Sequence, residues 1–212
     1  MNLREEDYLR YIYELSLAYG ATHTSQLAKI LNIAQSSVVD ALDHLNKKHY
    51  IVYEKRFQII LTDEGRKEAL KSIRKHELAE VLLMNVLGLS WDECDDESML
   101  MEHGITDKIA IAIERITGAK RCPHGNPIPD KNLVIGKIPD TSLLDVTGSC
   151  IIFSVVYEDK HILQFLNSVS IFPDTSLIVT GKSDNHLVVD KDNVEITIPI
   201  EIAKVIRVTQ SI

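Results

Sequence analysis

A short stretch in the middle of the chain concentrates side chains that can bind a metal ion. His76 and Glu80 are four residues apart, and Met99, Glu102 and His103 follow at spacings of three and one. Residues three and four apart share one face of an α-helix, so each set would direct its side chains to one side. Imidazole, carboxylate and thioether groups together suit Fe²⁺ or Mn²⁺ better than Mg²⁺ or Ca²⁺. The pattern predicts two metal sites on a pair of helices.

Each of these residues also has an ordinary structural interpretation. A single histidine on a helix is more often a core or surface residue than a ligand, and Met99 alone is typical of a core. Asp95 could simply favour the start of a helix. Only the joint pattern favours metal, and from spacing alone both interpretations stay open.

Apolar periodicity and helix caps place the elements that would carry these ligands. One helix is expected over residues 63–88, and a Ser-Trp-Asp-Glu capping box at 90–93 opens the helix with the second ligand set. Thr106 begins a third helix over 107–117. Three amphipathic helices bury too little apolar surface alone, so a second copy of the chain is expected to cover the remainder in a homodimer.

The N-terminal residues predict a winged helix-turn-helix. Helices are expected at about residues 5–18, from Thr24 or Ser25, and over 35–48, with two short strands on either side of residues 54–57. In this motif the helix after the turn enters the DNA major groove, and a wing reaches the phosphate backbone. A small helical domain with solvated lysines is the alternative. The residues expected to contact DNA are Gln35, Ser36, Ser37, Asp40, Lys47, Lys55 and Arg56.

The distribution of charge agrees with DNA binding at this end, although the chain as a whole has a net charge of −8. Residues 1–75 carry 12 Lys and Arg against 10 Asp and Glu, whereas the remainder carries 11 against 21. Uneven surface solvation is the alternative explanation. No apolar run approaches the ~20 residues of a membrane span, and the first residues lack a signal-peptide pattern. Three scattered cysteines without a CxxC motif argue against a disulfide framework, so a cytoplasmic protein is expected.

The C-terminal residues change to short β-rich runs separated by turn clusters. Strands are expected at residues 149–156, 176–180, 186–189, 194–198 and 205–208. Five short strands predict a small β-barrel. The predicted fold class is therefore mainly α with small β parts.

Four separate motifs make the chain resemble the diphtheria toxin repressor family of iron- and manganese-dependent transcriptional regulators. They are Glu-Asp-Tyr-Leu-Arg at 6–10, followed by Ile-Tyr-Glu-Leu at 12–15; Arg-Lys-His-Glu-Leu-Ala-Glu at 74–80; Met-Glu-His at 101–103; and Cys-Pro-His-Gly-Asn-Pro-Ile-Pro at 122–129. The resemblance covers nearly the whole chain. It implies a winged helix-turn-helix domain over 1–73, a helical metal-binding and dimerisation domain with a tether over 74–138, and an SH3-like (FeoA-like) domain over 139–212.

The resemblance implies a regulatory metal site at Asp7, Met99, Glu102 and His103. At the first two positions, iron-responsive members typically have Met and Cys, and manganese-responsive members have Asp and Glu. This chain combines Asp7 with Met99. The remaining thioether favours Fe²⁺, with Mn²⁺ as the alternative.

The resemblance also implies an ancillary metal site. Asp95 stands where iron-type members usually have His, and His161 stands where a Gln is usual. Cys122 and His124 lie where the family's tether begins, so we interpret both as structural. The implied ancillary ligands are His76, Glu80, Asp95, Glu158 and His161.

The sequence as a whole predicts a metal-dependent DNA-binding repressor without enzymatic activity. Binding of Fe²⁺, Mn²⁺ or another divalent transition metal would fix a homodimer in the geometry that binds double-stranded operator DNA, and would control metal-homeostasis genes. No membrane and no small-molecule substrate is expected. One alternative is a metallohydrolase with His76 and Glu80 as ligands, although no HExxH motif is present. The other is a winged-helix regulator that senses a small organic molecule.

Overall fold

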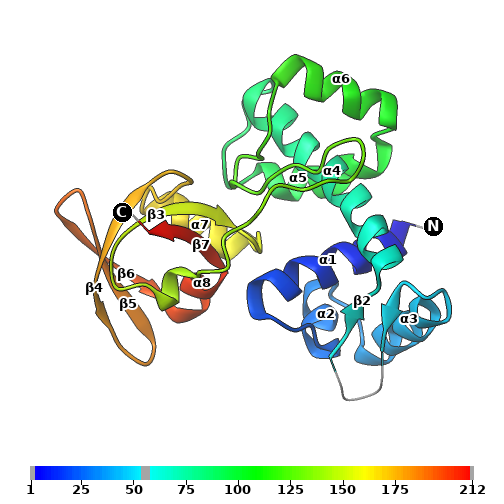
Figure 1. Cartoon of the computed structure of the whole chain (residues 1–212), viewed down its shortest axis with the longest axis horizontal. Helices are drawn as coiled ribbons and strands as arrows, with labels where there is room; N and C mark the ends of the chain where they lie inside the picture. Colours follow the sequence, from blue (N-terminus) through cyan, green and yellow to red (C-terminus); the bar gives the residue numbers. More distant parts are fainter. Residues whose placement is uncertain (1–2, 54–57, 211–212) are drawn as a thin grey trace. The chain divides into compact units, whose positions relative to one another are not determined.

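A computed structural model describes residues 3–53 and 58–210 of the chain. It divides the chain into two compact units, Met1–Arg74 with Pro129–Val134, and Lys75–Ile128 with Ile135–Ile212. Figure 1 shows the elements of both units. Lys55 and Arg56, expected at the tip of the wing, lie outside the described residues.

The first unit has the element order of a winged helix-turn-helix. An isolated bridge between Thr22 and Ile59 extends the antiparallel pairing of its two short strands. The second helix begins at Thr24 with His23 as its N-cap, whose backbone N–H donates to the Gln26 side chain; the predicted cap was therefore one or two residues too late. The elements are α1 (Leu3–Tyr19), α2 (Thr24–Ile30), α3 (Gln35–Lys47), β1 (Ile51–Val52) and β2 (Ile60–Leu61).

The face that α3 turns toward the core follows its apolar period. Val38, Leu42 and Leu45 are buried, with at most 1% of each residue exposed. They recur at spacings of three and four, which places them on one side of the helix. The other side of α3 is therefore available to solvent.

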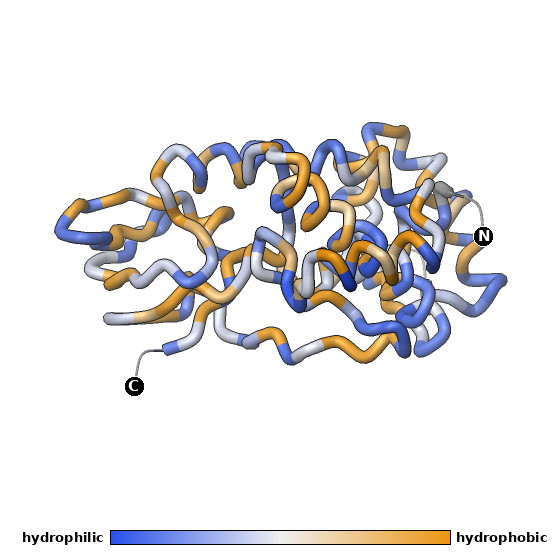
Figure 2. The backbone as a smooth tube through the Cα atoms, turned by 90° about the horizontal axis from the view of Figure 1, so that it is seen from above, coloured by the Kyte–Doolittle hydropathy of each residue, from blue (hydrophilic) through white to orange (hydrophobic). Residues whose placement is uncertain are grey.

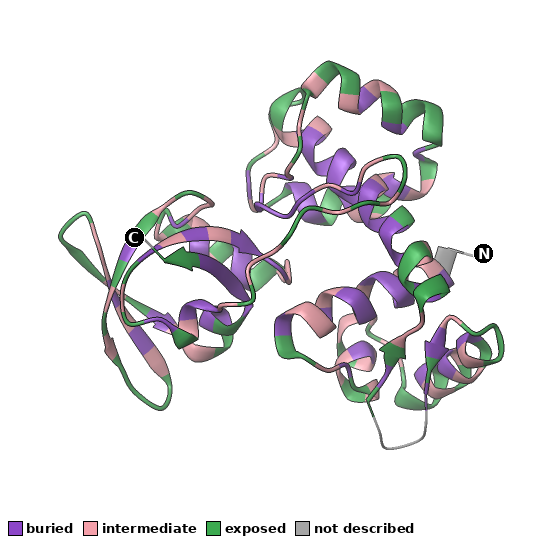
Figure 3. Ribbon diagram, in the orientation of Figure 1, coloured by how far each residue is buried: buried purple, intermediate pink, exposed green. Residues whose placement is uncertain are grey.

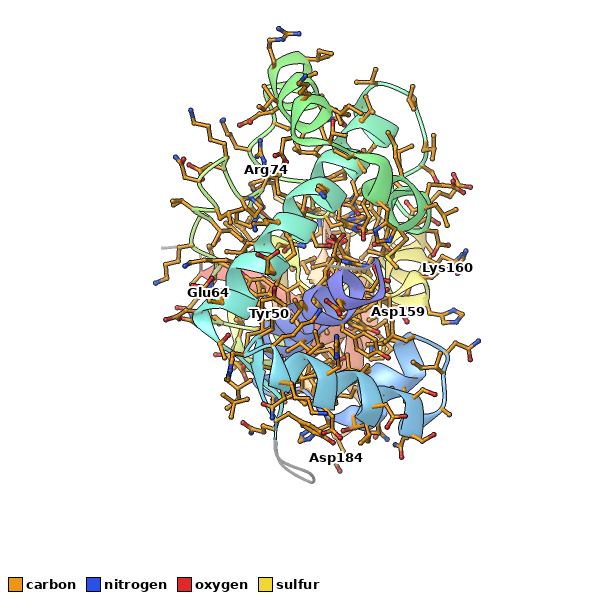
Figure 4. All side chains as sticks on the ribbon, turned by 90° about the vertical axis from the view of Figure 1, so that its right-hand side faces the viewer. Tyr50, Glu64, Arg74, Asp159, Lys160 and Asp184 are labelled. Atoms are coloured by element: carbon orange, nitrogen blue, oxygen red, sulfur yellow. The ribbon has the colours of Figure 1, made fainter. Side chains whose placement is uncertain are left out.

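The start of α4 (Asp63–Asn85) packs tightly against the segment that precedes the hairpin. Thr62 caps this helix by accepting a hydrogen bond from the Gly65 N–H at 3.0 Å. A Cβ atom on Gly65 would lie 1.8 Å from the Tyr50 carbonyl oxygen. Figure 4 labels Tyr50 and Glu64, the residue before this glycine. Only glycine permits this close approach.

The helices of the second unit form a core around the buried part of α4, coloured purple in Figure 3. Leu78 and Ala79 pack there with Ala110 and Ile113. The other elements are α5 (Cys94–Met101), the 3₁₀ turn η1 (Glu102–Gly104) and α6 (Asp107–Thr117), which Thr106 caps as predicted.

Two details of these helices differ from the sequence prediction. Residues 90–93 form a turn before α5, in which the Ser90 hydroxyl donates to Glu93, so the helix begins only at Cys94. Glu102 and His103 lie on η1 instead of the preceding α-helix. Their side chains therefore leave the backbone from a tighter turn than an i, i+3 helical spacing assumes.

A five-stranded antiparallel sheet occupies the C-terminal part of the second unit, in the order β6-β5-β4-β3-β7. The predicted fold class is confirmed. Two short helices, α7 and α8, were not predicted, although α7 buries Ile162, Leu163 and Leu166 at helical spacing. The elements are η2 (Leu143–Asp145), β3 (Gly148–Val155), α7 (Lys160–Ser168), β4 (Ser176–Lys182), β5 (His186–Lys191), β6 (Val194–Pro199), α8 (Ile200–Val205) and β7 (Ile206–Gln210).

Hydrophobic and hydrophilic residues alternate along the backbone in Figure 2. Within residues 3–53 and 58–210, none of the helices has the length and the apolar content that crossing a membrane requires.

Candidate metal centre

His76 lies on the buried part of α4 and uses both ring nitrogens. Its Nδ1 lies 2.7 Å from Glu102 Oε2, and its Nε2 lies 3.0 Å from Asp95 Oδ1. A neutral imidazole can donate from only one nitrogen. If Nδ1–H donates to Glu102, the lone pair of Nε2 faces the carboxylates of Asp95 and Glu80. This carboxylate–histidine arrangement is typical of metal sites.

Glu80 lies one helical turn further along α4, with no exposed surface. Its Oε1 lies 3.6 Å from His76 Nε2 and 2.9 Å from His124 Nδ1. Neither carboxylate oxygen has a partner in hydrogen-bond geometry among the described residues. Burial raises the pKa of Glu80, but the imidazoles of His124 and His76 outweigh burial and lower the pKa to about 2. Glu80 is therefore a buried carboxylate whose oxygens can accept a cation.

The loop at residues 121–127 positions His124 on the other side of Glu80. Gly125 has a φ of +92°, and a Cβ atom there would lie 2.3 Å from the Phe153 carbonyl oxygen. This position therefore requires glycine. The Gly125 N–H donates to the Cys122 carbonyl oxygen at 3.0 Å and closes the turn that presents the imidazole.

Trp91 fixes the orientation of the His124 ring. His124 Nε2 donates to the Trp91 carbonyl oxygen at 2.9 Å, and the Trp91 indole packs edge-on against the imidazole, with ring centroids 4.7 Å apart. The indole N–H in turn donates to the Pro123 carbonyl oxygen. With Nε2–H engaged, Nδ1 points at Glu80, and at Glu158 Oε2 3.3 Å away. A backbone carbonyl that holds the distal nitrogen is the usual way to aim an imidazole at a metal.

Glu158 reaches the centre from the segment between β3 and α7. Its side chain is 10% exposed, and its Oε1 accepts a hydrogen bond from Asn126 Nδ2 at 2.6 Å. Asp159 caps α7 by accepting from the His161 N–H at 2.9 Å. Lys160, labelled in Figure 4, forms an ion pair with Asp96 near the start of α5. These contacts hold Glu158 beside the helical part of the same unit.

Several groups in this centre have shifted pKa values. Burial raises the pKa of the Cys122 thiol well above its ordinary value, and the carboxylates of Glu77, Glu80 and Glu158 raise it further. Burial and the carboxylates of Glu158 and Glu80 raise the pKa of Glu77 well above its ordinary value. Burial opposes the charge on His124, but Glu80 and Glu158 outweigh it and raise its pKa well above the ordinary value. The proton on His124 thus stands where a metal cation would supply positive charge.

The donor atoms form two overlapping groups, each with its atoms within 4.8 Å of one another. Both contain Glu80 and Glu158. Buried nitrogen, oxygen and sulfur donors in this arrangement fit a transition-metal ion. One group is completed by His76 and Asp95, the other by Cys122 and His124.

The two groups change the ligand set implied by the resemblance. Cys122 and His124, which we interpreted as structural, are both buried with their donor atoms beside Glu80 and Glu158, so they become additional candidate ligands. His161 is exposed on α7 and belongs to neither group. Glu158, three residues earlier, is the residue of this segment that belongs to both donor groups.

The residues of the implied regulatory site lie in both units. Asp7 is partly buried on α1 of the first unit. Met99 on α5, and Glu102 and His103 on η1, belong to the second unit. Glu102 is buried, whereas Met99 and His103 are partly exposed. Glu102 also forms a hydrogen bond with His76. A residue of the implied regulatory site therefore contacts a residue of the implied ancillary site.

Of the residues expected to contact DNA, those within the described range are exposed on α3. They are Gln35, Ser36, Ser37, Asp40 and Lys47. The first three occupy the first turn of α3, which the motif places nearest the base edges.

An open cavity of about 470 Å³ borders the second donor group. Cys122, Trp91 and Arg121 are among its lining residues.

A winged helix-turn-helix together with buried nitrogen, oxygen and sulfur donors defines a metal-binding, DNA-binding regulator. Residues 2–58 match the family description "Iron dependent repressor, N-terminal DNA binding domain", and residues 62–130 match "Iron dependent repressor, metal binding and dimerisation domain".

Known proteins agree with these matches. The solved structure of T. acidophilum IdeR is 34% identical, with 97% of each chain covered and a TM-score of 0.91. The manganese regulator SloR is 25% identical, with 98% of each chain covered and a TM-score of 0.86. The diphtheria toxin repressor of Corynebacterium jeikeium is 31% identical over 137 residues, which span 64% of this chain and 57% of that relative. The chain belongs to the iron-dependent repressor family of transcriptional regulators.

Proposed function

We propose that the chain is a repressor that binds operator DNA as a homodimer when it holds Fe²⁺ or Mn²⁺, and so controls metal-homeostasis genes. The single observation that carries the proposal is the buried pair of Glu80 and His124. Both present donor atoms without hydrogen-bond partners among the described residues, in a chain of the iron-dependent repressor family. A bound cation would offset the free-energy cost of burying polar atoms that have no hydrogen-bond partner.

The proposed regulatory site has four ligands. Asp7 would contribute a carboxylate from the DNA-binding unit, and Met99, Glu102 and His103 would contribute donors from the second unit. A divalent ion held by these ligands would favour the DNA-competent state by as much as its affinity differs between the two states of the protein. The thioether of Met99 supports Fe²⁺ as the preferred metal. ScaR structures with bound Cd²⁺ and Zn²⁺ support the ability of other divalent ions to substitute.

The same proposal assigns a role to each segment of the chain. Residues 1–73 bind DNA, residues 74–138 bind metal and dimerise, and residues 139–212 form the SH3-like domain that contributes Glu158. Ile109, Ile111 and Ile116 on α6 are exposed apolar residues that a second copy could cover. A regulator of this class acts where the DNA is, so we place the protein in the cytoplasm. The family supports a regulator without enzymatic activity, and it supports neither the metallohydrolase nor the regulator of a small organic molecule.

The test measures DNA binding under anaerobic conditions. Metal-free protein is loaded with Fe²⁺, Mn²⁺ or Zn²⁺, a duplex is selected from a random library, and its affinity is titrated against each metal. We expect tight binding only with metal, tightest with Fe²⁺, and a lost response in His103→Ala. Equal affinity with and without metal, or a full response in His103→Ala, would overturn the proposal.

A further inference from the structure

The exposed side of α3 carries a carboxylate without a partner among the described residues. Asp40 is exposed, and its carboxylate forms no hydrogen bond and no ion pair with another described side chain. Other carboxylates of the same unit are paired: Glu14 with Arg10 at 2.9 Å, and Glu64 with Lys67 at 2.8 Å. The oxygens of Asp40 are therefore free to accept hydrogen bonds from a bound ligand.

Glu5 on α1 explains why Asp40 lacks a cation. Residues three and four apart are neighbours on a helix, and His44 is four residues beyond Asp40. The His44 ring turns instead to Glu5, with 3.1 Å between Nε2 and Oε1. Lys48 Nζ also donates to Glu5, at 2.8 and 3.1 Å from its two carboxylate oxygens. Glu5 is only 7% exposed, so solvent screens these contacts little. Both basic side chains are thus held toward α1, and Asp43 adds a second negative charge beside Asp40.

The position of Asp40 on α3 brings it close to the bases of bound DNA. It lies one helical turn beyond Ser36 and Ser37, which are exposed on the same side of the helix. The helix-turn-helix motif places this part of the helix in the major groove. Phosphates repel a carboxylate in the groove, so binding is favourable only where base edges donate hydrogen bonds to it.

The donors of the major groove restrict which base can satisfy this carboxylate. Guanine presents the acceptors N7 and O6, and thymine presents the acceptor O4. Adenine donates from N6, but its N7 acceptor lies beside that amino group. Cytosine presents the N4 amino donor alone. Cytosine is therefore the base whose edge best matches an acceptor that cannot donate.

We infer that Asp40 is a specificity-determining residue that accepts a hydrogen bond from the N4 amino group of a cytosine, once in each half-site of the operator. This inference rests on the proposed function for operator binding, and it adds the base that this residue selects. A good contact of this kind discriminates against the wrong base by about tenfold to a hundredfold. Repulsion from the phosphates lowers affinity for DNA without this cytosine, so the same carboxylate also acts against the wrong sequences.

Two substitutions at Asp40 separate this role from a general effect of charge. The side chain of Asp40→Asn has the same size, and an asparagine amide pairs with adenine by accepting from N6 and donating to N7. The preferred base at one position should therefore change from cytosine to adenine. Asp40→Ala should lose the preference and gain no other. Asp43→Asn is the matched control, because it removes the same charge from the same helix. It should raise affinity for all sequences alike and leave the preferred bases unchanged.

The experiment uses the full chain loaded anaerobically with Fe²⁺. The unchanged chain and the three variants each select duplexes from a random library. Affinity is then measured for the duplex of the unchanged chain, with each of the four base pairs placed in turn at every half-site position. We expect one symmetric position where the unchanged chain prefers cytosine by about tenfold or more, and where Asp40→Asn prefers adenine. All other positions should keep their preferred bases.

The same preferred bases in the unchanged chain and in Asp40→Asn would overturn this inference. So would a base other than cytosine at the position that Asp40→Asn alters, or an equal alteration by Asp43→Asn. The proposed function fails separately, if the unchanged chain binds its selected duplex equally well without metal. A chain that needs metal to bind DNA, but whose Asp40→Asn variant selects the same bases, would refute this inference alone.

Discussion

Replacing His124 by glutamine should remove metal-induced stabilisation from the second unit. The amide nitrogen of Gln can still donate to the Trp91 carbonyl oxygen, but the imidazole donor that faces Glu80 and Glu158 is lost. His124 is one of four donors in its group, and even outer partners of a metal site change affinity by roughly 10–100-fold. We therefore expect the affinity of this group to fall about 100-fold.

The expected change in thermal stability follows from mass action. At a free Mn²⁺ concentration of about 100 times the original Kd, binding stabilises the unchanged chain by about 2.7 kcal/mol. After a 100-fold loss of affinity, the same concentration contributes only about 0.4 kcal/mol. A difference near 2 kcal/mol corresponds to a metal-induced rise in Tm that is about 5–9 °C smaller in the variant.

The assay is thermal unfolding with and without Mn²⁺, and the quantity compared is the difference between the two Tm values. Losing the contact with Glu80 also lowers the Tm of the metal-free variant, because a buried ion pair is broken. Comparing each variant's own Tm with and without Mn²⁺ removes this metal-independent loss of stability. His161→Gln is the matched control, since His161 is exposed and outside both donor groups. If His124→Gln shows the same metal-induced rise as the unchanged chain, His124 has a structural role only and the ligand assignment is wrong.

Three further predictions address other parts of the chain. Gly65→Ala should lower the free energy of unfolding in urea by about 1–3 kcal/mol, because the new Cβ would lie 1.8 Å from a backbone carbonyl oxygen; Gly104→Ala, whose Cβ meets no atom within 4 Å, should have little effect. In the metal-free protein, ionised Glu80 stabilises the fold above its ordinary pKa of 4.5, and this stabilisation should disappear as the pH falls toward its folded pKa of about 2. Urea unfolding across that range should show the loss, and Glu80→Gln should flatten it; an unchanged slope would contradict the assignment. Lys47→Ala should weaken DNA binding to a similar extent for all sequences, and should reduce the slope of log affinity against log salt concentration by about one. Lys120→Ala, in the other unit, should leave DNA binding unchanged.

Much of the fold could be predicted from the sequence because its helices have a regular apolar period and clear caps. Val38, Leu42 and Leu45 face the core of the first unit as their spacing predicts, and Thr106 caps α6. The start of α5 was placed too early because Ser90 and Glu93 also satisfy one another in a turn that precedes the helix. Helix α7 was missed because it is short and lies among strands, so a β-rich interpretation of the surrounding residues prevailed.

The candidate site could be predicted only where its ligands share a helix. His76 and Glu80 are visible as an i, i+4 pair, because helical spacing places them on one face. Cys122 and His124 come from a loop whose conformation depends on Gly125 and on contacts with Trp91. Such contacts leave no periodic pattern in the sequence, so they could not be predicted from it. The unusual Cys-Pro-His-Gly sequence was the available signal, and its proline content favoured the interpretation as a tether.

The position of Glu158 supports a role for the C-terminal domain in the proposed metal centre. Its carboxylate lies within 4 Å of donor atoms on His76 of α4, and on Cys122 and His124 of the loop at residues 121–127. Because Asp159 caps the helix that follows, the position of Glu158 depends on how α7 packs against the helices. We therefore expect metal affinity and the packing of this domain to be linked in both directions. A bound cation should stabilise the packing, and any change that weakens the packing should lower the affinity for metal.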